Sequence, residues 1–320
     1  MSLPYILRLL GLCLGAFFVV HLAAGLVVAR LAAAAIRRAG HMRASRAAGF
    51  LFALRVLPPA IGLLAVAGVC APSYLLLEPH ASGEEVGFGF LAAAVLGAAI
   101  CAAALWRSAS AIRVLVHFER EWTRAASLRH TGGDSMLVLP EETPFLAMAG
   151  IFRPRLVVSR AVLNALEPEE LDTAIAHEYA HRASRDNLKR LALLLSPDLL
   201  PAWPAFDSIE AAWRRFSEWA ADDRAAGGDS ARSLSLAAAL VRVARLSGAP
   251  VMSPLVTPLL ADTSELAARV DRLLATPSTP AGRTWAVPAL ASAAIALTLF
   301  AAAQPGTLAW VHGALERLVH

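Results

Sequence analysis

Two histidines and a glutamate near the middle of the chain have the types and the spacing of a hydrolytic zinc site. His177, Glu178 and His181 form the pattern H-E-x-x-H, in a segment that is expected to be helical. Residues i and i+4 of a helix share a face, so both imidazoles can bind one metal ion. Glu178 then lies beside the metal, where it can act as the general base that takes a proton from a zinc-activated water. The motif predicts zinc-dependent hydrolysis of peptide bonds.

A catalytic zinc site needs a third protein ligand, and two histidines with a glutamate are a known set. Glu218 is the candidate, because its neighbours are Trp219 and two alanines, which suggests a buried position on a helix. Asp222 follows one turn later on the same face. A carboxylate there can hold the other ring nitrogen of a ligating histidine. We therefore expect one zinc ion on His177, His181 and Glu218, supported by Asp222.

Two features near the motif have more than one interpretation. Asp186, five residues after His181, either caps the next helix or forms a hydrogen bond beside the metal site. A second group that stabilises an oxyanion also remains open, because the chain has no tyrosine in a suitable place outside the motif. The alternatives for that role are His117, His130 and Arg224.

The composition indicates a membrane protein. Hydrophobic residues make up 57% of the chain and charged residues 17%, and the mean hydropathy is +0.56. A membrane helix needs about 20 consecutive apolar residues. Four stretches meet this requirement, at about residues 9–29, 56–77, 86–106 and 285–303. The first is longer than the apolar core of a secretory signal, so we expect it to remain as a helix.

The arginines predict the orientation of these spans. Five of them follow the first span, and four more follow the third, whereas the loop between the second and third spans has three glutamates and no Lys or Arg. By the positive-inside rule, the first loop and the polar region after the third span are cytoplasmic, and both termini are outside. The net charge of +4 thus reflects topology. It does not indicate nucleic-acid binding, because basic and aromatic residues are not interleaved.

The polar region is long enough for one globular domain. We predict a membrane region at residues 1–107, a metallopeptidase domain at 108–282, and a fourth span with a short outer tail at 283–320. Strands are expected at 136–139, 144–149 and 155–159, after a helix at about 107–128. Further helices begin at Pro168, Asp186 and Phe206, and the last of these ends at Gly227 and Gly228. Asp229 is a candidate cap of the next helix, and a final helix begins at about Thr263. The fold class is therefore mainly α with a small β-sheet: a four-helix polytopic membrane protein whose zinc domain lies between the third and fourth spans.

Four segments carry a resemblance to the membrane zinc peptidases of the BlaR/MecR type. They are H-E-Y-A-H at 177–181, R-D-N-L at 185–188, F-R-P-R-L-V-V-S at 152–159 and E-P-E-E-L at 167–171. The E-x-x-x-D pattern of Glu218 and Asp222 is similar to that of the HtpX and CAAX-prenyl-protease family. Both resemblances imply a gluzincin site with His177, His181 and Glu218 as zinc ligands. They also imply a bacterial cytoplasmic membrane and a protein substrate, such as a winged-helix transcriptional repressor.

One departure from the BlaR/MecR pattern limits this expectation. About 17 residues follow the predicted fourth span, and the only lysine, Lys189, does not complete the Ser-x-x-Lys motif of a penicillin-binding sensor. No β-lactam binding is expected. We therefore expect regulatory proteolysis of a cytoplasmic repressor or self-cleavage. The alternatives are an HtpX-like quality-control protease and a receptor or scaffold that binds without cleaving.

Overall fold

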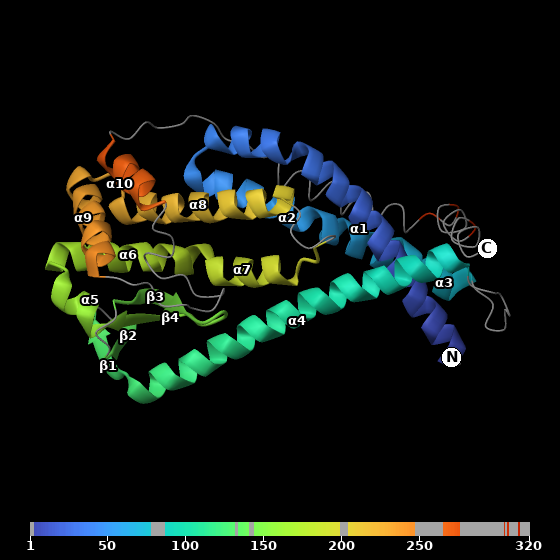
Figure 1. Cartoon of the computed structure of the whole chain (residues 1–320), viewed down its shortest axis with the longest axis horizontal. Coiled ribbons are helices and arrows are strands. Elements are labelled where there is room, and N and C mark those ends of the chain that lie inside the picture. The colour runs from blue at the N-terminus through green and yellow to red at the C-terminus, as the bar shows by residue number, and fades with distance from the viewer. Residues whose placement is uncertain are drawn as a thin grey trace.

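The computed structural model describes residues 3–77, 87–131, 134–140, 144–198, 204–246 and 265–275, together with Gln304, Gly306 and Gly313. Within these residues the chain is mostly helical, with one small four-stranded sheet. The predicted fourth span at about 285–303 lies outside the described residues, as do nearly all of the predicted linker and tail around it. The N-terminal helices and a second group of helices around the sheet pack side by side (Figure 1).

Within the described part of the chain, three helical stretches are long and apolar enough to cross a membrane. The first is α1 (Leu3–Gly40) and the third is α4 (Phe88–Ala125), each of 38 residues. The second is α2 (Ala44–Ala65), which continues through a π-helical turn (Val66–Cys70) into α3 (Ala71–Leu77). A helix as long as α1 or α4 extends about 57 Å, at about 1.5 Å per residue. The hydrocarbon core of a bilayer is only about 30 Å thick. The first two predicted spans lie within these stretches, and the third, at 86–106, coincides with α4 from Phe88 onward. Both α1 and α4 extend well beyond the predicted spans.

The sheet has the strand order β1-β2-β4-β3. Its strands are β1 (Ser127–Thr131), β2 (Asp134–Leu139), β3 (Leu146–Ala149) and β4 (Arg155–Ser159). The central pair, β2 and β4, is parallel and the two outer pairs are antiparallel, so β3 is an edge strand. The last three strands were predicted. The first was not, because the helix expected to reach Leu128 ends at Ala125 and the chain then pairs with β2.

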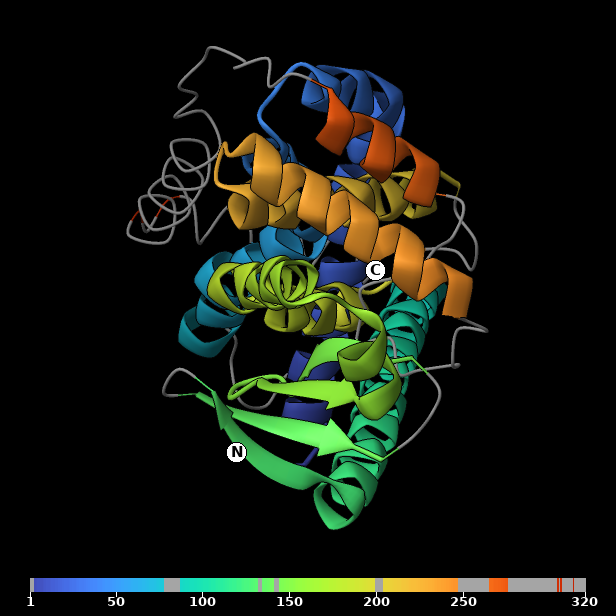
Figure 2. The same cartoon turned by 90° about the vertical axis from the view of Figure 1, so that its left-hand side faces the viewer.

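Alternate residues of β2, β3 and β4 are buried on opposite faces of the sheet and enter different cores. Val138 and Met148 pack in a core that α5 (Arg160–Ala165), α6 (Pro168–Ser184), α9 (Ser230–Leu246) and α10 (Leu266–Leu274) complete. Their neighbours Leu137 and Ala147 pack instead against Leu115 and other residues of α4. Figure 2 shows α9 lying across α6, with α10 beside it.

The helix that carries the motif is held at both of its ends. At the start of α6, Glu167 and Glu170 form a reciprocal capping box, and Pro168 occupies the first helical turn. At the end of α6, Arg185 adopts a left-handed conformation with φ 55°, and α7 (Asp186–Leu195) begins at the next residue. This tight break turns the chain so that Asp186 lies beside the last turn of α6.

The helix that carries Glu218, α8 (Pro204–Ala226), packs directly against the first two membrane helices. Its buried apolar residues share one core with small residues of α1 and α2, such as Ala39 and Ala47. Figure 1 shows α8 between this helical pair and α7. The helix α8 therefore shares a core with the first two membrane helices. The residues of α8 in this core are Phe206, Ile209, Ala212, Trp213 and Phe216.

Candidate metal centre

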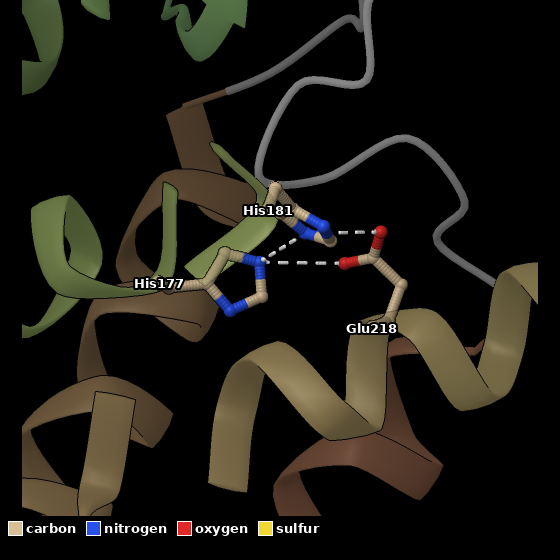
Figure 3. A group of neighbouring side chains, drawn as sticks. All are labelled: His177, His181 and Glu218. Carbon is tan, nitrogen blue, oxygen red and sulfur yellow. Dashed lines mark hydrogen bonds and ion pairs between the residues drawn. The ribbon is translucent and has the colours of Figure 1, made fainter. Parts of the chain in front are cut away.

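Three side chains from α6 and α8 point at one another (Figure 3). Nε2 of His177 lies 3.1 Å from Nε2 of His181. Glu218 places one oxygen 3.4 Å from His177 Nε2 and the other 3.5 Å from His181 Nε2. One ligand atom from each residue lies within 4.8 Å of the other two. The two histidines are buried and Glu218 is partly buried, so the group could form a metal site at the base of an accessible surface.

The chemistry of these donors fits zinc. Two nitrogen ligands on a tetrahedral zinc ion, each at about 2.0–2.1 Å, lie about 3.3 Å apart. The observed separation of 3.1 Å is close to this value. Carboxylates face the Nδ1 atoms of both rings, so the Nε2 atoms are the ones directed at the shared centre. Two imidazole nitrogens and a carboxylate that converge in a buried place are a typical zinc ligand set.

His177 is held from behind by an ion pair that crosses three helices. Its Nδ1 lies 2.9 Å from Asp222 Oδ1, although the ring N–H is not well aligned for a hydrogen bond. Asp222 in turn accepts two hydrogen bonds from the guanidinium of Arg269 on α10, at 2.7 and 3.0 Å. The same guanidinium lies 3.1 Å from Glu218. Arg269 thus supports one ligand through Asp222 and another ligand directly.

His181 is held by Asp186, the first residue of α7. The Nδ1 atom of His181 lies 2.8 Å from Asp186 Oδ2, which also accepts a hydrogen bond from Ser217 at 2.9 Å. The other oxygen of Asp186 accepts from Lys189 at 2.8 Å. Asp186 was predicted either to cap the next helix or to form a hydrogen bond beside the metal site. The structure has the hydrogen bond beside the site, and no side chain caps α7.

Glu178 is oriented toward the centre by the sheet. The side chain is 1% exposed, and its Oε2 accepts a hydrogen bond from the backbone N–H of Met148 on β3 at 3.0 Å. Its other oxygen, Oε1, is buried and has no hydrogen-bond partner among the described residues. One oxygen is thus fixed by the backbone and the other remains available to a proton donor.

At the outer edge of β3, the backbone N–H and the backbone carbonyl of Met148 both form hydrogen bonds with side chains. Besides the N–H bound by Glu178, its carbonyl accepts a hydrogen bond from Asn187 at 3.0 Å, and the Gly150 carbonyl accepts another at 2.8 Å. Asn187 follows Asp186 directly, so the start of α7 holds both His181 and the edge strand. Asn187 was not predicted, because nothing in the local sequence indicates that it reaches a strand 39 residues away.

The charges of the centre perturb the pKa values of its residues strongly. Burial disfavours the charged form of His181, but Glu218 and Asp186 outweigh burial and raise its pKa to about 10. Burial also lowers the pKa of His177, but Asp222 and Glu218 outweigh this effect and raise that pKa. Burial raises the pKa of Glu178. Glu218 shows the reverse shift: its pKa lies well below the ordinary value, because His181 and Arg269 outweigh its burial. Such shifts are typical of functional sites.

The candidates for a second oxyanion donor do not join the centre. His117 on α4 is exposed and pairs with Glu121 at 3.2 Å. Arg224 donates to the carbonyl of Ala180 and to Ser184 on α6. His130 lies on β1, at the sheet edge opposite β3. Sequence reasoning also missed Arg269, Ser217 and Lys189, which reach the site only through the packing of α7, α8 and α10.

Comparison with known proteins agrees with this centre. Residues 119–252, which include His177, His181 and Glu218, match the family model of peptidase family M48. Peptidases of this family are zinc metalloproteases, and the match supports a metallopeptidase function of the membrane type. No curated protein and no solved structure matches the chain significantly. The narrower resemblances to BlaR/MecR and to HtpX remain predictions.

Proposed function

We propose that this chain is a membrane-embedded zinc metalloendopeptidase. The observation that carries the proposal is the position of Glu178 beside three convergent ligands. This carboxylate is buried, one of its oxygens is fixed by Met148, and the other has no hydrogen-bond partner among the described residues. A domain that bound a partner without cleaving it would need the metal ligands but not a carboxylate held in this way. The arrangement therefore favours hydrolysis over the scaffold alternative.

In the proposed mechanism His177, His181 and Glu218 would hold the zinc ion. When bound, zinc supplies a Lewis acid that lowers the pKa of water to about 7. Glu178 Oε1 accepts a proton from the attacking water and later donates it to the nitrogen of the leaving amine. Burial raises the pKa of Glu178, which makes it a stronger base than an exposed carboxylate. The hydrogen bond to Asp186 keeps His181 in the tautomer that presents Nε2, and the carboxylate of Asp222 faces Nδ1 of His177.

The substrate would lie along the open edge of the sheet as an additional strand. Successive backbone groups of a strand point alternately inward and outward, so Leu146 faces outward as Met148 does. The groups of Met148 are already used by Glu178 and Asn187, which leaves Leu146 as the pairing position on β3. A cavity of about 320 Å³ adjoins His181 and has Ile151, Phe152 and Leu188 in its wall. It offers room for an apolar side chain of the substrate.

The place and the biological role of the reaction are proposed from sequence features. The distribution of arginines favours a zinc domain that faces the cytoplasm, with both termini outside. The proposed substrate is a cytoplasmic protein, such as a winged-helix repressor, or the chain itself. Membrane-protein quality control of the HtpX type remains the alternative. Cleavage of a repressor in reconstituted membranes, compared with cleavage of unfolded membrane proteins, would distinguish the two roles.

The proposed function is tested by the metal content and peptidase activity of the full chain in detergent. The wild type is expected to hold about one zinc ion per chain. His177→Ala should lose the zinc, whereas Glu178→Gln should retain it and lose peptidase activity by about 10²-fold to 10⁴-fold.

His117→Ala is a matched control, because this histidine is exposed on α4 and away from the centre. It should leave both zinc and activity unchanged. Full zinc stoichiometry in His177→Ala would refute the ligand assignment. Undiminished peptidase activity in Glu178→Gln would refute the assignment of the base.

A further inference from the structure

A buried arginine in the second membrane helix contacts both α8 and the segment that follows α7. Arg55 lies on α2, and its side chain is 1% exposed. The sequence suggests that an arginine at this place extends to the membrane surface, but here the guanidinium is enclosed by protein. A buried charge is tolerated when it is paired. Arg55 has two carboxylate partners, and it also lies 4.8 Å above the ring of Phe206.

One carboxylate lies just after α7 and the other lies on α8. Asp198 follows the end of α7, and its Oδ1 lies 2.5 Å from Arg55 Nη2. Glu210 is on α8, and its Oε1 lies 2.8 Å from Arg55 Nε. The opposite part of each helix carries the metal-site residues: Asp186 begins α7 and holds His181, and Glu218 lies about two turns after Glu210. A single guanidinium therefore connects the helix that holds one ligand to the helix that supplies another.

Polar side chains of the other two membrane helices also contact the α7 side of this junction. Arg107 on α4 pairs with Asp198 and donates to the carbonyls of Leu194 and Ser196 at 3.3 and 3.0 Å. His21 on α1 lies 3.2 Å from the Pro197 carbonyl. Among the described residues, Arg55 is the one whose charged group reaches both the end of α7 and α8.

From this geometry we propose that Arg55 is a positioning residue for the metal centre. It sets the spacing of α7 and α8, and through them the position of Glu218 relative to His181. Metal ligands must lie within about 0.2 Å of their ideal distances, so a small change in helix spacing is sufficient to weaken binding. The inference rests on the proposed zinc site, and it makes the second membrane helix part of the peptidase as well as its anchor.

The test uses the full chain in detergent with its three cysteines replaced by alanine. Spin labels at Leu188→Cys on α7 and Ala211→Cys on α8, both exposed positions, report the helix spacing in zinc-free protein. Arg55→Ala should shift or broaden the distribution of distances between the two spin labels. It should also weaken zinc binding about tenfold and alter the visible spectrum of bound Co²⁺. Arg55→Lys should recover part of the loss, because an ammonium group cannot bind both carboxylates in the same way.

Arg46→Ala is the matched control, because Arg46 is on the same helix and makes no ion pair within the described part of the chain. It should change neither quantity. A folded Arg55→Ala protein with the wild-type distance and zinc affinity would overturn the inference. If Arg55→Ala does not fold, Glu210→Gln, which keeps the side-chain shape, is judged by the same two measurements. A wild type that binds no zinc refutes the proposed function instead, while the distance measurement still tests the role of Arg55.

Discussion

Arg269 and Asp222 form a two-point ion pair behind the metal centre, although they are 47 residues apart in the sequence. Asp222 is 1% exposed and Arg269 is 4% exposed, so both charges depend on this contact. The pair lies between α8 and α10 and faces His177 on α6. It connects the orientation of a metal ligand to the packing of the last described helix.

Removing Arg269 should weaken both metal binding and folding. In Arg269→Ala the carboxylate of Asp222 is left buried without its partner, which costs about 3–5 kcal/mol of unfolding free energy. Zinc affinity should fall about 10-fold to 100-fold, because His177 loses its support. Chemical denaturation and competition with a chelating dye measure the two effects. Arg272→Ala is the control: its ion pair with Asp223 is substantially exposed, so it should cost at most about 1 kcal/mol.

Replacing Asp186 should lower zinc affinity more than replacing Ser217 or Lys189, the two other residues that bind its carboxylate. Asp186→Ala removes the hydrogen bond to His181, so zinc affinity should fall about 10-fold to 100-fold. Ser217→Ala and Lys189→Ala each leave that hydrogen bond in place and should change the affinity several-fold less. Equal losses in all three variants, measured by dye competition, would show that Asp186 acts through the packing of α7 and not through His181.

Asn187 should affect catalysis without affecting the metal. Asn187→Ala leaves the carbonyls of Met148 and Gly150 without their donor, which costs about 1–3 kcal/mol of stability. Because β3 also fixes Glu178, peptidase activity should fall while zinc content stays at the wild-type level. Asn164→Ala, at an exposed position on α5, is the control. A loss of zinc in Asn187→Ala would contradict the separation of these two roles.

Zinc binding should release protons at neutral pH. Zinc binds neutral imidazole, but the pKa of His181 is raised to about 10 in the zinc-free protein, and that of His177 is raised as well. A group with a raised pKa is protonated below that value, so protons compete with zinc less as the pH rises toward about 10. Affinity should therefore increase between about pH 6 and about pH 9. Calorimetry in buffers of different ionisation enthalpy counts the protons, and a pH-independent affinity would contradict the prediction.

Residues 108–282 should not form a stable soluble domain by themselves. Without α1 and α2, the face of α8 that contains Ile209, Trp213 and Phe216 would be exposed. Size-exclusion chromatography should show aggregates for this fragment. Co-expression with residues 1–107 should restore a species that binds zinc. A monomeric fragment that binds zinc would show that the shared core is dispensable.

Much of the local structure could be predicted from the sequence. The capped start of α6 at Pro168, the end of α8 before two glycines and three of the strands follow from short-range signals. The strand β1 could not be predicted, because it follows directly on a long helix and forms only through its pairing with β2. The lengths of α1 and α4 exceed their apolar stretches, since the outer part of α1 packs against α8 and the outer part of α4 packs against the sheet.

The sequence by itself determined the pair of histidines and the adjacent glutamate, because the helical repeat places residues i and i+4 on one face wherever the helix lies. It also indicated Glu218 and Asp222 as a pair on one face of a second helix. The tertiary structure decided which carboxylate faces which imidazole, and that Arg269, Asn187 and Arg55 support the centre. These contacts depend on how separate helices and a sheet edge pack, and no local pattern in the chain encodes a distance between elements that are far apart in sequence.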